Sequence, residues 1–322
     1  MAVYTDVDSD ALAAFLADYN LGEPLSFKGI AEGVENSNFL LETTRGRYIL
    51  TLFEKRVAEA DLPFFIGLMD HLALAGLSCP TPIAARDGKA LRRLAGRPAV
   101  IVSFLTGVSP RKPNVAQCAS VGAALADLHE AGRGFAIPRE NALSLAGWRS
   151  LVNACAADAD KVRPGLAETL AGELAFLEAR WPKDLPRGVI HADLFTDNVF
   201  FIGDDVSGLI DFYFACNDFL AYDLAICLNA WCFEPDGAFN ATKAMALTRG
   251  YTAKRPLSRA EAEAIPLFCR GSALRFLLTR LYDWLNQVPG ALVRPKDPIE
   301  YLNKLRFHTG AQGPETYGIT ID

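Results

Sequence analysis

Long apolar runs and an excess of basic residues are both missing from this sequence of 322 residues. No uninterrupted apolar stretch approaches the ~20 residues that a helix needs to cross a bilayer, so we expect no membrane span. The 32 lysines and arginines are outnumbered by 38 aspartates and glutamates, which gives a net charge of −6. A chain of this charge has no general attraction for nucleic acid phosphates, so we expect neither a nucleic acid nor a membrane as partner.

The motifs of several common site types are also absent. The seven cysteines include no C-x-x-C pair and the four histidines are isolated, so neither a zinc site nor a disulfide framework is expected. The sequence has no G-x-S-x-G of serine hydrolases and no phosphate-binding P-loop. Its first ten residues are acidic where targeting signals are basic. We therefore expect a cytoplasmic protein whose cysteines are small, buried, apolar side chains.

The chain divides into two parts that differ in their apolar patterns. Up to residue 105, short runs rich in β-branched and aromatic residues alternate with turn signals, as in antiparallel hairpins, and helical spacing is confined to 10–19 and 57–75. The strand-like runs are residues 38–42, 48–53 and 98–104. The later helical stretches lie near residues 114–131, 144–157, 165–181, 218–233, 239–251, 258–287 and 297–308. We therefore predict an α+β fold, with a small antiparallel β-rich lobe over residues 1–105 and a larger, mainly helical lobe over 106–322.

The helical part is interrupted at residues 188–212 by β-like runs joined by polar loops, and chemistry-bearing residues gather there. Asp193 and Asn198 are separated by four residues, and Asp211 follows after enough chain for a hairpin. In phosphoryl-transfer enzymes such an Asp accepts the proton of the attacking hydroxyl, while the Asn and the second Asp hold Mg²⁺. We therefore predict Asp193 as the catalytic base and Asn198 and Asp211 as metal ligands. His191 is expected to orient the loop by hydrogen bonds.

The β-rich lobe is the expected place for the nucleotide. A small polar turn at 31–39 lies between two predicted strands, where backbone N–H groups and short side chains can face phosphates. The candidate residues in this turn are Gly33, Glu35, Asn36, Ser37 and Asn38. The strand that ends near Ser103 leads into the connection between the lobes, so backbone groups of Ser103 and Leu105 are candidates for the adenine edge. A buried strand and linker without a ligand is the alternative there.

These motifs together resemble the aminoglycoside phosphotransferase and choline kinase superfamily, which consists of small-molecule kinases with a protein-kinase-like two-lobed fold. The chain is similar in particular to the bacterial branch that phosphorylates L-homoserine. The similar segments are residues 33–39, 48–55, 191–201, 209–213, 218–225 and 279–284. The resemblance implies ATP as co-substrate, Mg²⁺ as cofactor, and formation of O-phospho-L-homoserine for threonine biosynthesis.

The resemblance also bears on two residues outside the loop. Asp223 sits where the superfamily has an aspartate in a helix-starting motif, and we expect it to be structural. Many of these kinases carry a phosphate-binding lysine on a strand of the small lobe. In this sequence Thr51 occupies the corresponding position and is a candidate nucleotide-binding residue. Thr51 supplies no charge. Lys55 or Arg56 at the strand end, or a larger contribution from Mg²⁺, are the alternatives left open.

Homoserine requires a basic partner for its carboxylate and an acidic partner for its ammonium group. The helical lobe offers candidates with this chemistry: Arg275, Arg280, Asp218 and Asp283. An ordinary surface ion pair or helix cap is the alternative for each. Two other functions also stay open. One is a kinase for another small alcohol, such as choline, a hydroxylated amine or an aminoglycoside. The other is a nucleotide-binding pseudokinase, which the missing lysine favours, and nothing in the sequence specifies an oligomeric state.

Overall fold

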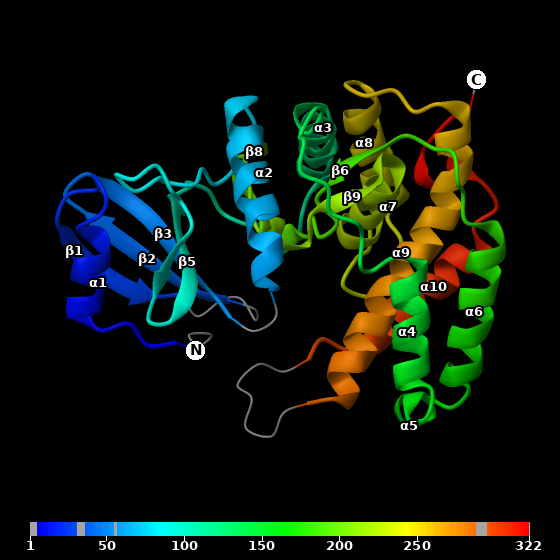
Figure 1. The fold of residues 1–322 in the computed structure, drawn as a ribbon. Helices are drawn as coiled ribbons and strands as arrows, with labels where there is room; N and C mark the ends of the chain where they lie inside the picture. Colours follow the sequence, from blue (N-terminus) through cyan, green and yellow to red (C-terminus); the bar gives the residue numbers. More distant parts are fainter. Residues whose placement is uncertain (1–4, 31–35, 55–56, 288–294, 322) are drawn as a thin grey trace.

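The structure is a computed structural model that describes residues 5–30, 36–54, 57–287 and 295–321. A five-stranded antiparallel sheet lies at one end of the molecule and most of the helices lie at the other (Figure 1). The strands follow the order β1-β2-β3-β5-β4 across the sheet. Their bounds are Pro24–Gly29, Asn36–Thr43, Gly46–Phe53, Arg92–Leu94 and Arg97–Ser103 for β1 to β5. The three strand-like runs expected from the sequence correspond to β2, β3 and β5.

Helix α1 (Ser9–Leu16) covers one face of this sheet. It begins at Asp8, whose carboxylate accepts a hydrogen bond from the Ala11 amide at 2.7 Å and so caps the helix. Its buried side chains form a hydrophobic cluster with Leu50 and Leu52 of β3. Because side chains alternate between the two faces of a strand, the residues between these leucines face the other side.

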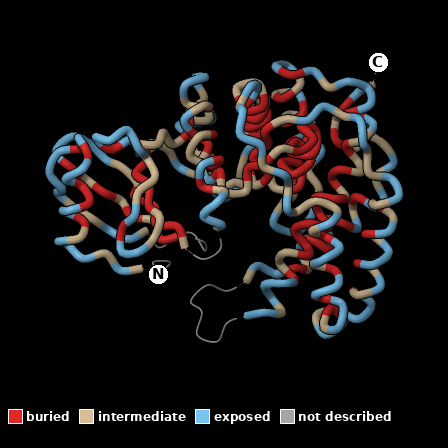
Figure 2. Tube along the Cα trace, in the orientation of Figure 1, coloured by how far each residue is buried: buried red, intermediate tan, exposed pale blue. Residues whose placement is uncertain are grey.

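Helix α2 (Leu62–Leu74) packs on that other side and connects the sheet to the rest of the protein. Phe53 of β3 and Val100 of β5 belong to the same buried cluster as Leu68 of α2 and the helices of the second part. Figure 1 places α2 between the sheet and the remaining helices, and Figure 2 shows its buried stretches. The β-rich part is therefore packed against the helical part through one face of its sheet.

The chain passes from the sheet to the helices through a closely packed linker. Val108 and Phe201 exchange backbone hydrogen bonds of 3.0 and 3.1 Å, which fasten the linker to a hairpin of the helical part. A Cβ atom at Gly107 would lie 2.4 Å from the Ser207 hydroxyl and 2.6 Å from Phe200 Cβ. Only glycine allows this close approach.

The described residues of the helical part form eight α-helices and two short strand pairs. The helices are α3 (Val115–Ala131), α4 (Leu145–Cys155), α5 (Ala159–Val162), α6 (Leu166–Arg180), α7 (Leu220–Trp231), α8 (Ala241–Thr252), α9 (Arg259–Leu285) and α10 (Pro298–Gly310). Strand β6 (Arg187–Ile190) pairs with β9 (Cys216–Phe219), and β7 (Val199–Ile202) pairs with β8 (Asp205–Leu209). The short 3-10 helices are η1 (Glu59–Asp61), η2 (Thr196–Asn198), η3 (Phe212–Phe214) and η4 (Pro314–Tyr317). The two strand pairs occupy the segment in which the sequence predicts the site.

Several elements differ from the sequence-based expectations, and strands β1 and β4 lie outside the three predicted strand-like runs. The helix expected from residue 57 begins at Leu62, after η1, and has a proline in its first turn, where a missing N–H is tolerated. Residues 218–219 were expected to start a helix but lie in β9, because pairing with β6 uses their backbone groups. Helix α5 was not expected, since four residues are too few to show a helical period.

The cysteine expectation is confirmed, because all seven cysteines are buried and free. Burial raises the pKa of the thiols, for example that of Cys118 to about 11, so they are protonated at neutral pH. None of the helices in the described residues is both long and apolar enough to cross a membrane.

The buried His308 of α10 predicts a loss of stability in mild acid. Its Nε2 donates to Asn229 Oδ1 at 3.0 Å and its Nδ1 accepts from the Tyr317 hydroxyl at 2.8 Å, so the ring is neutral. Burial, with Lys304 nearby, lowers its pKa to about 3. Between that pH and the ordinary value of ~6.5 the unfolded chain binds the extra proton, so stability falls as the pH falls.

We expect this histidine to remove about 2 kcal/mol of unfolding free energy between pH 7 and pH 5. His308→Gln keeps a donor and an acceptor but does not titrate. Urea unfolding at the two pH values should therefore show a smaller pH dependence in the variant. Equal pH dependence in both proteins would contradict this assignment.

Candidate active site

The loop of residues 191–198 joins β6 to β7 and carries two of the three residues expected to perform chemistry. The side-chain amide of Asn198 donates to the Asp193 backbone carbonyl at 2.8 Å and to its carboxylate at 3.3 Å. The Ile210 amide donates to the Asn198 carbonyl at 3.0 Å, so the next residue, Asp211, lies beside Asn198. The fold therefore brings Asp193, Asn198 and Asp211 together.

His191 is fully buried at the start of this loop. Its Nε2 donates to the Ile210 carbonyl at 2.9 Å, and this fixes the tautomer because a carbonyl can only accept. Its Nδ1 then accepts from the Asp193 amide at 3.3 Å. Burial lowers the pKa of His191, which keeps the ring neutral. Both ring nitrogens thus serve contacts with the backbone on either side of the site.

The buried carboxylate of Asp223, in α7, binds the backbone of the same loop. It accepts the His191 amide at 2.7 Å and the Ala192 amide at 2.9 Å. His129 of α3 donates to it from 3.2 Å. Burial alone would raise the pKa of Asp223, but the hydrogen bond and charge of His129 and the contacts with the loop hold it below its usual value. An ionised carboxylate therefore holds the start of the loop.

Ala192 and Asp211 both have a left-handed backbone conformation, with φ of 64° at each. For a residue other than glycine this costs ~1–3 kcal/mol and persists only where the surroundings impose it. At Ala192 the amide is held by Asp223, and the carbonyl accepts from the guanidinium of Arg275. Helices α7 and α9 therefore fix the turn that immediately precedes Asp193.

The surroundings of Asp193 make its carboxylate more basic than an exposed aspartate. Burial is the main reason that its pKa is raised well above the usual value, and the charges of Asp211 and Asp197 add to the effect. The nearby charge of Arg275 opposes it. A carboxylate of raised pKa is a better proton acceptor when ionised.

The residues predicted to bind phosphates are only partly described. Two residues of the predicted turn, Gly33 and Glu35, and the two possible replacements for the lysine, Lys55 and Arg56, lie outside the described residues. The remaining turn residues, Asn36, Ser37 and Asn38, form the start of β2. The Ser37 hydroxyl donates to Glu54 at 2.8 Å, and the Asn36 side chain accepts the Glu54 amide at 3.4 Å. Asn38 accepts the Thr51 hydroxyl at 2.8 Å. These side chains connect β2 to β3 next to the polar turn.

Thr51 lies on the same face of the sheet as Phe53, toward the helical part. Tyr213 packs edge-on against Phe53, with 5.3 Å between the ring centroids. Burial and the nearby Asp211 raise the pKa of Tyr213, and a hydrogen bond with Thr51 opposes that rise. The position at which the resemblance implies a lysine therefore faces the segment that carries Asp211, without a charge.

The two positions expected at the adenine edge differ in their backbone groups. Ser103 is already paired with Thr81, because its amide donates to the Thr81 carbonyl and its hydroxyl accepts the Thr81 amide, both at 2.9 Å. Within the described chain, no hydrogen bond occupies the backbone groups of Leu105. Leu105 therefore offers a free backbone edge in the linker, and the Ser103 amide does not.

Of the four residues expected to bind substrate, Arg275 has a hydrogen bond to the loop. Arg275 is buried and reaches the Ala192 carbonyl. Arg280 forms an ion pair with α10, and Asp218 accepts a hydrogen bond from the Asn141 side chain at 2.8 Å. Asp283 is exposed on α9. Arg275 is therefore the member of this group that the fold places at the site.

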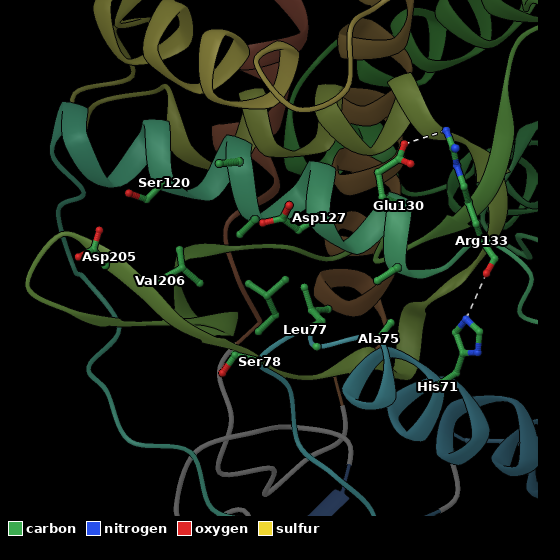
Figure 3. Close-up of a pocket in the computed structure, with 15 residues that line it drawn as sticks. His71, Ala75, Leu77, Ser78, Ser120, Asp127, Glu130, Arg133, Asp205 and Val206 are labelled. Atoms are coloured by element: carbon green, nitrogen blue, oxygen red, sulfur yellow. Dashed lines mark hydrogen bonds and ion pairs between the residues drawn. The ribbon is translucent and has the colours of Figure 1, made fainter.

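The described part of the structure has two notable cavities, and only the smaller one is lined by a predicted site residue. One of about 870 Å³ lies between the end of α2, α3 and β8, and Figure 3 shows its polar side chains, among them His71 and Asp127. None of the sequence-predicted site residues lines it. A smaller cavity of about 330 Å³ is lined by Asp61, Arg139 and Arg275, among others. Through Arg275 this second cavity adjoins the loop.

Sequence reasoning missed two residues that line the smaller cavity, Arg139 and Tyr213. The Arg139 guanidinium binds the Asp61 carboxylate and the Ala215 carbonyl, both at 2.9 Å. Arg139 lies in an irregular loop, so no periodic pattern marks it. Tyr213 stands two residues after Asp211, and this closeness was the available signal.

Comparison with known proteins identifies the family. Residues 26–257, more than half of the chain, match the model of the phosphotransferase enzyme family. The homoserine kinase of Rhodopseudomonas palustris strain TIE-1 is 66% identical over 322 residues, which cover 100% of this chain and 98% of that protein. This chain belongs to the phosphotransferase enzyme family, in its homoserine kinase branch. The homoserine kinase of Bradyrhizobium diazoefficiens is 65% identical, over 99% of this chain and 98% of its own length.

Solved structures of phosphotransferases share the fold at low sequence identity. Spectinomycin phosphotransferase superposes with a TM-score of 0.71 at 13% identity and covers 96% of this chain and 99% of its own. Choline kinase from Cryptosporidium parvum superposes with a TM-score of 0.65 at 16% identity, over 94% of each chain. The expected fold is therefore confirmed as the protein-kinase-like α+β fold of these phosphotransferases.

Asn198 and Asp211 have the chemistry of Mg²⁺ ligands, because amide and carboxylate oxygens are hard ligands. The Asn198 side-chain nitrogen is turned toward Asp193, so the amide oxygen is left for another partner. No group of three or more His, Cys, Asp or Glu side chains in the described chain is arranged to hold a metal. A site with few protein ligands suits Mg²⁺, which completes its shell with water and substrate phosphates.

The anchor at Asp223 predicts a strong effect of its removal. Asp223→Asn loses the charge and one acceptor while the loop amides stay buried, so we expect the unfolding free energy to fall by about 3 kcal/mol and turnover to fall with it. Asp127→Asn makes the same change in an exposed ion pair with Lys254 and should cost less than ~1 kcal/mol. Urea unfolding of both variants tests this, and equal losses would contradict the anchoring role.

Proposed function

We propose that this protein transfers the γ-phosphoryl group of ATP to the side-chain hydroxyl of L-homoserine and forms O-phospho-L-homoserine. The observation that carries the proposal is the joint placement of Asp193, Asn198 and Asp211. Phosphoryl-transfer enzymes use these residue types to orient a hydroxyl and to neutralise phosphate charge. The choice of substrate rests on curated homoserine kinases that are 66% identical over the whole chain.

In the proposed reaction Asp193 accepts the proton of the homoserine hydroxyl. The hydroxyl oxygen attacks the γ-phosphorus in line, a new O–P bond forms, and the bond to the ADP oxygen breaks. The Asn198 side chain holds Asp193 in position, while His191 and Asp223 are positioning residues that fix the loop backbone. Most of the catalytic effect thus comes from placing the reacting groups.

Asn198 and Asp211 would hold Mg²⁺, and the ion would supply positive charge to the β- and γ-phosphate oxygens. Thr51 offers a hydroxyl in place of a lysine, so the charge needed at the phosphates rests more heavily on this metal site. Asn36, Ser37 and Asn38, at the start of β2, are the described residues that we assign to the phosphate side of the nucleotide site. Leu105 offers backbone groups to the adenine edge.

We assign nucleotide binding to residues 1–105 and the catalytic and substrate-binding residues to 106–322. The sheet ends at Ser103, and the helical part begins with α3 at Val115. The substrates and product of the proposed reaction are small polar molecules of central metabolism, which fits action in the cytoplasm.

Asp193→Asn tests the catalytic assignment. The amide cannot take the proton, so we expect kcat to fall at least ~100-fold while the affinity for ATP stays within about threefold. The matched control is Asp197→Asn, a change of the same kind in the same loop at a side chain that is 68% exposed. It removes a charge that helps to raise the pKa of Asp193 but leaves that carboxylate in place, so it should retain most of the turnover. Release of ADP in the presence of homoserine measures both variants, and full activity of Asp193→Asn would exclude it as the base.

A panel of alcohols separates homoserine from the alternative substrates. We expect kcat/KM for L-homoserine to exceed that for choline, ethanolamine and an aminoglycoside by at least ~100-fold. These alcohols have no carboxylate, so the groups of the site that bind the carboxylate would be left without a partner. Turnover of choline without homoserine would overturn the substrate assignment. Nucleotide binding with no turnover of any alcohol would instead favour the pseudokinase alternative.

A further inference from the structure

The cavity of about 330 Å³ beside the loop lies between the two parts of the protein. Asp61 and Phe65 line it from the β-rich part, and Arg139, Tyr213 and Arg275 line it from the helical part. Its volume is within the range of small-molecule sites. The aromatic rings give apolar walls, and the charged groups give fixed polar partners, as such sites require.

Arg275 is the unusual member of this lining. Its side chain is buried, with 1% of the residue exposed, and its Nη1 donates to the Ala192 carbonyl. The Arg275 Nε has no hydrogen-bond partner. Within the described chain Arg275 forms no ion pair, and the nearby Asp193 carboxylate acts on it by charge alone. A buried guanidinium without an ion-pair partner is costly. The cavity wall therefore holds a cation that no carboxylate of the lining pairs with, although the charge of Asp193 acts on it from nearby.

The charges of the described lining residues fit a monoanion. Arg139 is neutralised by Asp61, with 2.9 Å between Nε and Oδ2, and Arg275 adds one positive charge that no carboxylate of the lining pairs with. A single carboxylate would restore neutrality, and the planar guanidinium matches a carboxylate in geometry. A triphosphate carries several negative charges and would leave an excess of them here.

We propose that Arg275 binds the α-carboxylate of the substrate in this cavity. This inference rests on the proposed homoserine kinase activity and names the residue that selects an amino acid over a simple amino alcohol. The Ala192 carbonyl that Arg275 contacts immediately precedes Asp193 in the chain. A carboxylate held by Arg275 therefore places the rest of a short substrate next to the residue that accepts its proton.

The test compares L-homoserine with 3-aminopropan-1-ol, which has the same amine and hydroxyl but lacks the carboxylate. In the wild-type protein kcat/KM should favour homoserine strongly. Arg275→Met removes the hydrogen bond to the Ala192 carbonyl, so it should lower kcat for both substrates. It should also reduce the preference for homoserine by about 100-fold, through a rise in KM that 3-aminopropan-1-ol does not share. Arg275→Lys keeps the positive charge but loses the planar pair of donors that a carboxylate can accept together, so it should reduce the preference by about tenfold.

The control is Arg270→Met on the same helix, since Arg270 pairs with Glu173 away from the loop and should leave the preference unchanged. An equal loss for both substrates in the Arg275 variants would show that Arg275 only positions the loop, and would overturn the proposal. If Arg275→Met does not fold, the preference of Arg275→Lys decides. Absence of homoserine turnover in the wild-type protein would instead refute the proposed function, so the two failures are distinguishable.

Discussion

The buried carboxylate of Asp223 is the interaction on which the site depends. It accepts the amides of His191 and Ala192, at 2.7 and 2.9 Å, and is joined by His129. An ionised group in such a position is stable only when its oxygens are fully paired. The three donors come from a loop and from another helix, so helix packing and loop conformation stabilise each other. The backbone of the loop of residues 191–198 is consequently held in place by the protein's own side chains.

The same loop is held a second time from α9. The Ala192 carbonyl accepts from Arg275, and Ala192 has a left-handed conformation that its own side chain does not favour. Two helices that are far apart in sequence therefore impose one turn. Rigid support of this kind suits phosphoryl transfer, where the protein contributes mainly by placing the reacting groups.

The sheet and the helices are joined by both apolar and polar contacts. One face of the sheet packs on α1, and the other belongs to the same buried cluster as α2 and the helical part. Arg139 adds a polar connection, because it binds Asp61 at the start of α2 from a loop of the helical part. The smaller cavity is lined by residues of both parts, so it is complete only when the two parts are in contact.

The sequence by itself determined the α+β class and most of the element boundaries, and it predicted Asp193, Asn198 and Asp211 as the site residues. These features depend on local periodicity and on short spacings, which a linear pattern contains. It could not choose among Arg275, Arg280, Asp218 and Asp283. Only the tertiary structure singled out Arg275, since burial and the lack of an ion-pair partner depend on how α9 packs against the loop. Arg139 was hidden for the same reason: its partners, Asp61 and the Ala215 carbonyl, come from distant segments that meet only in the folded chain.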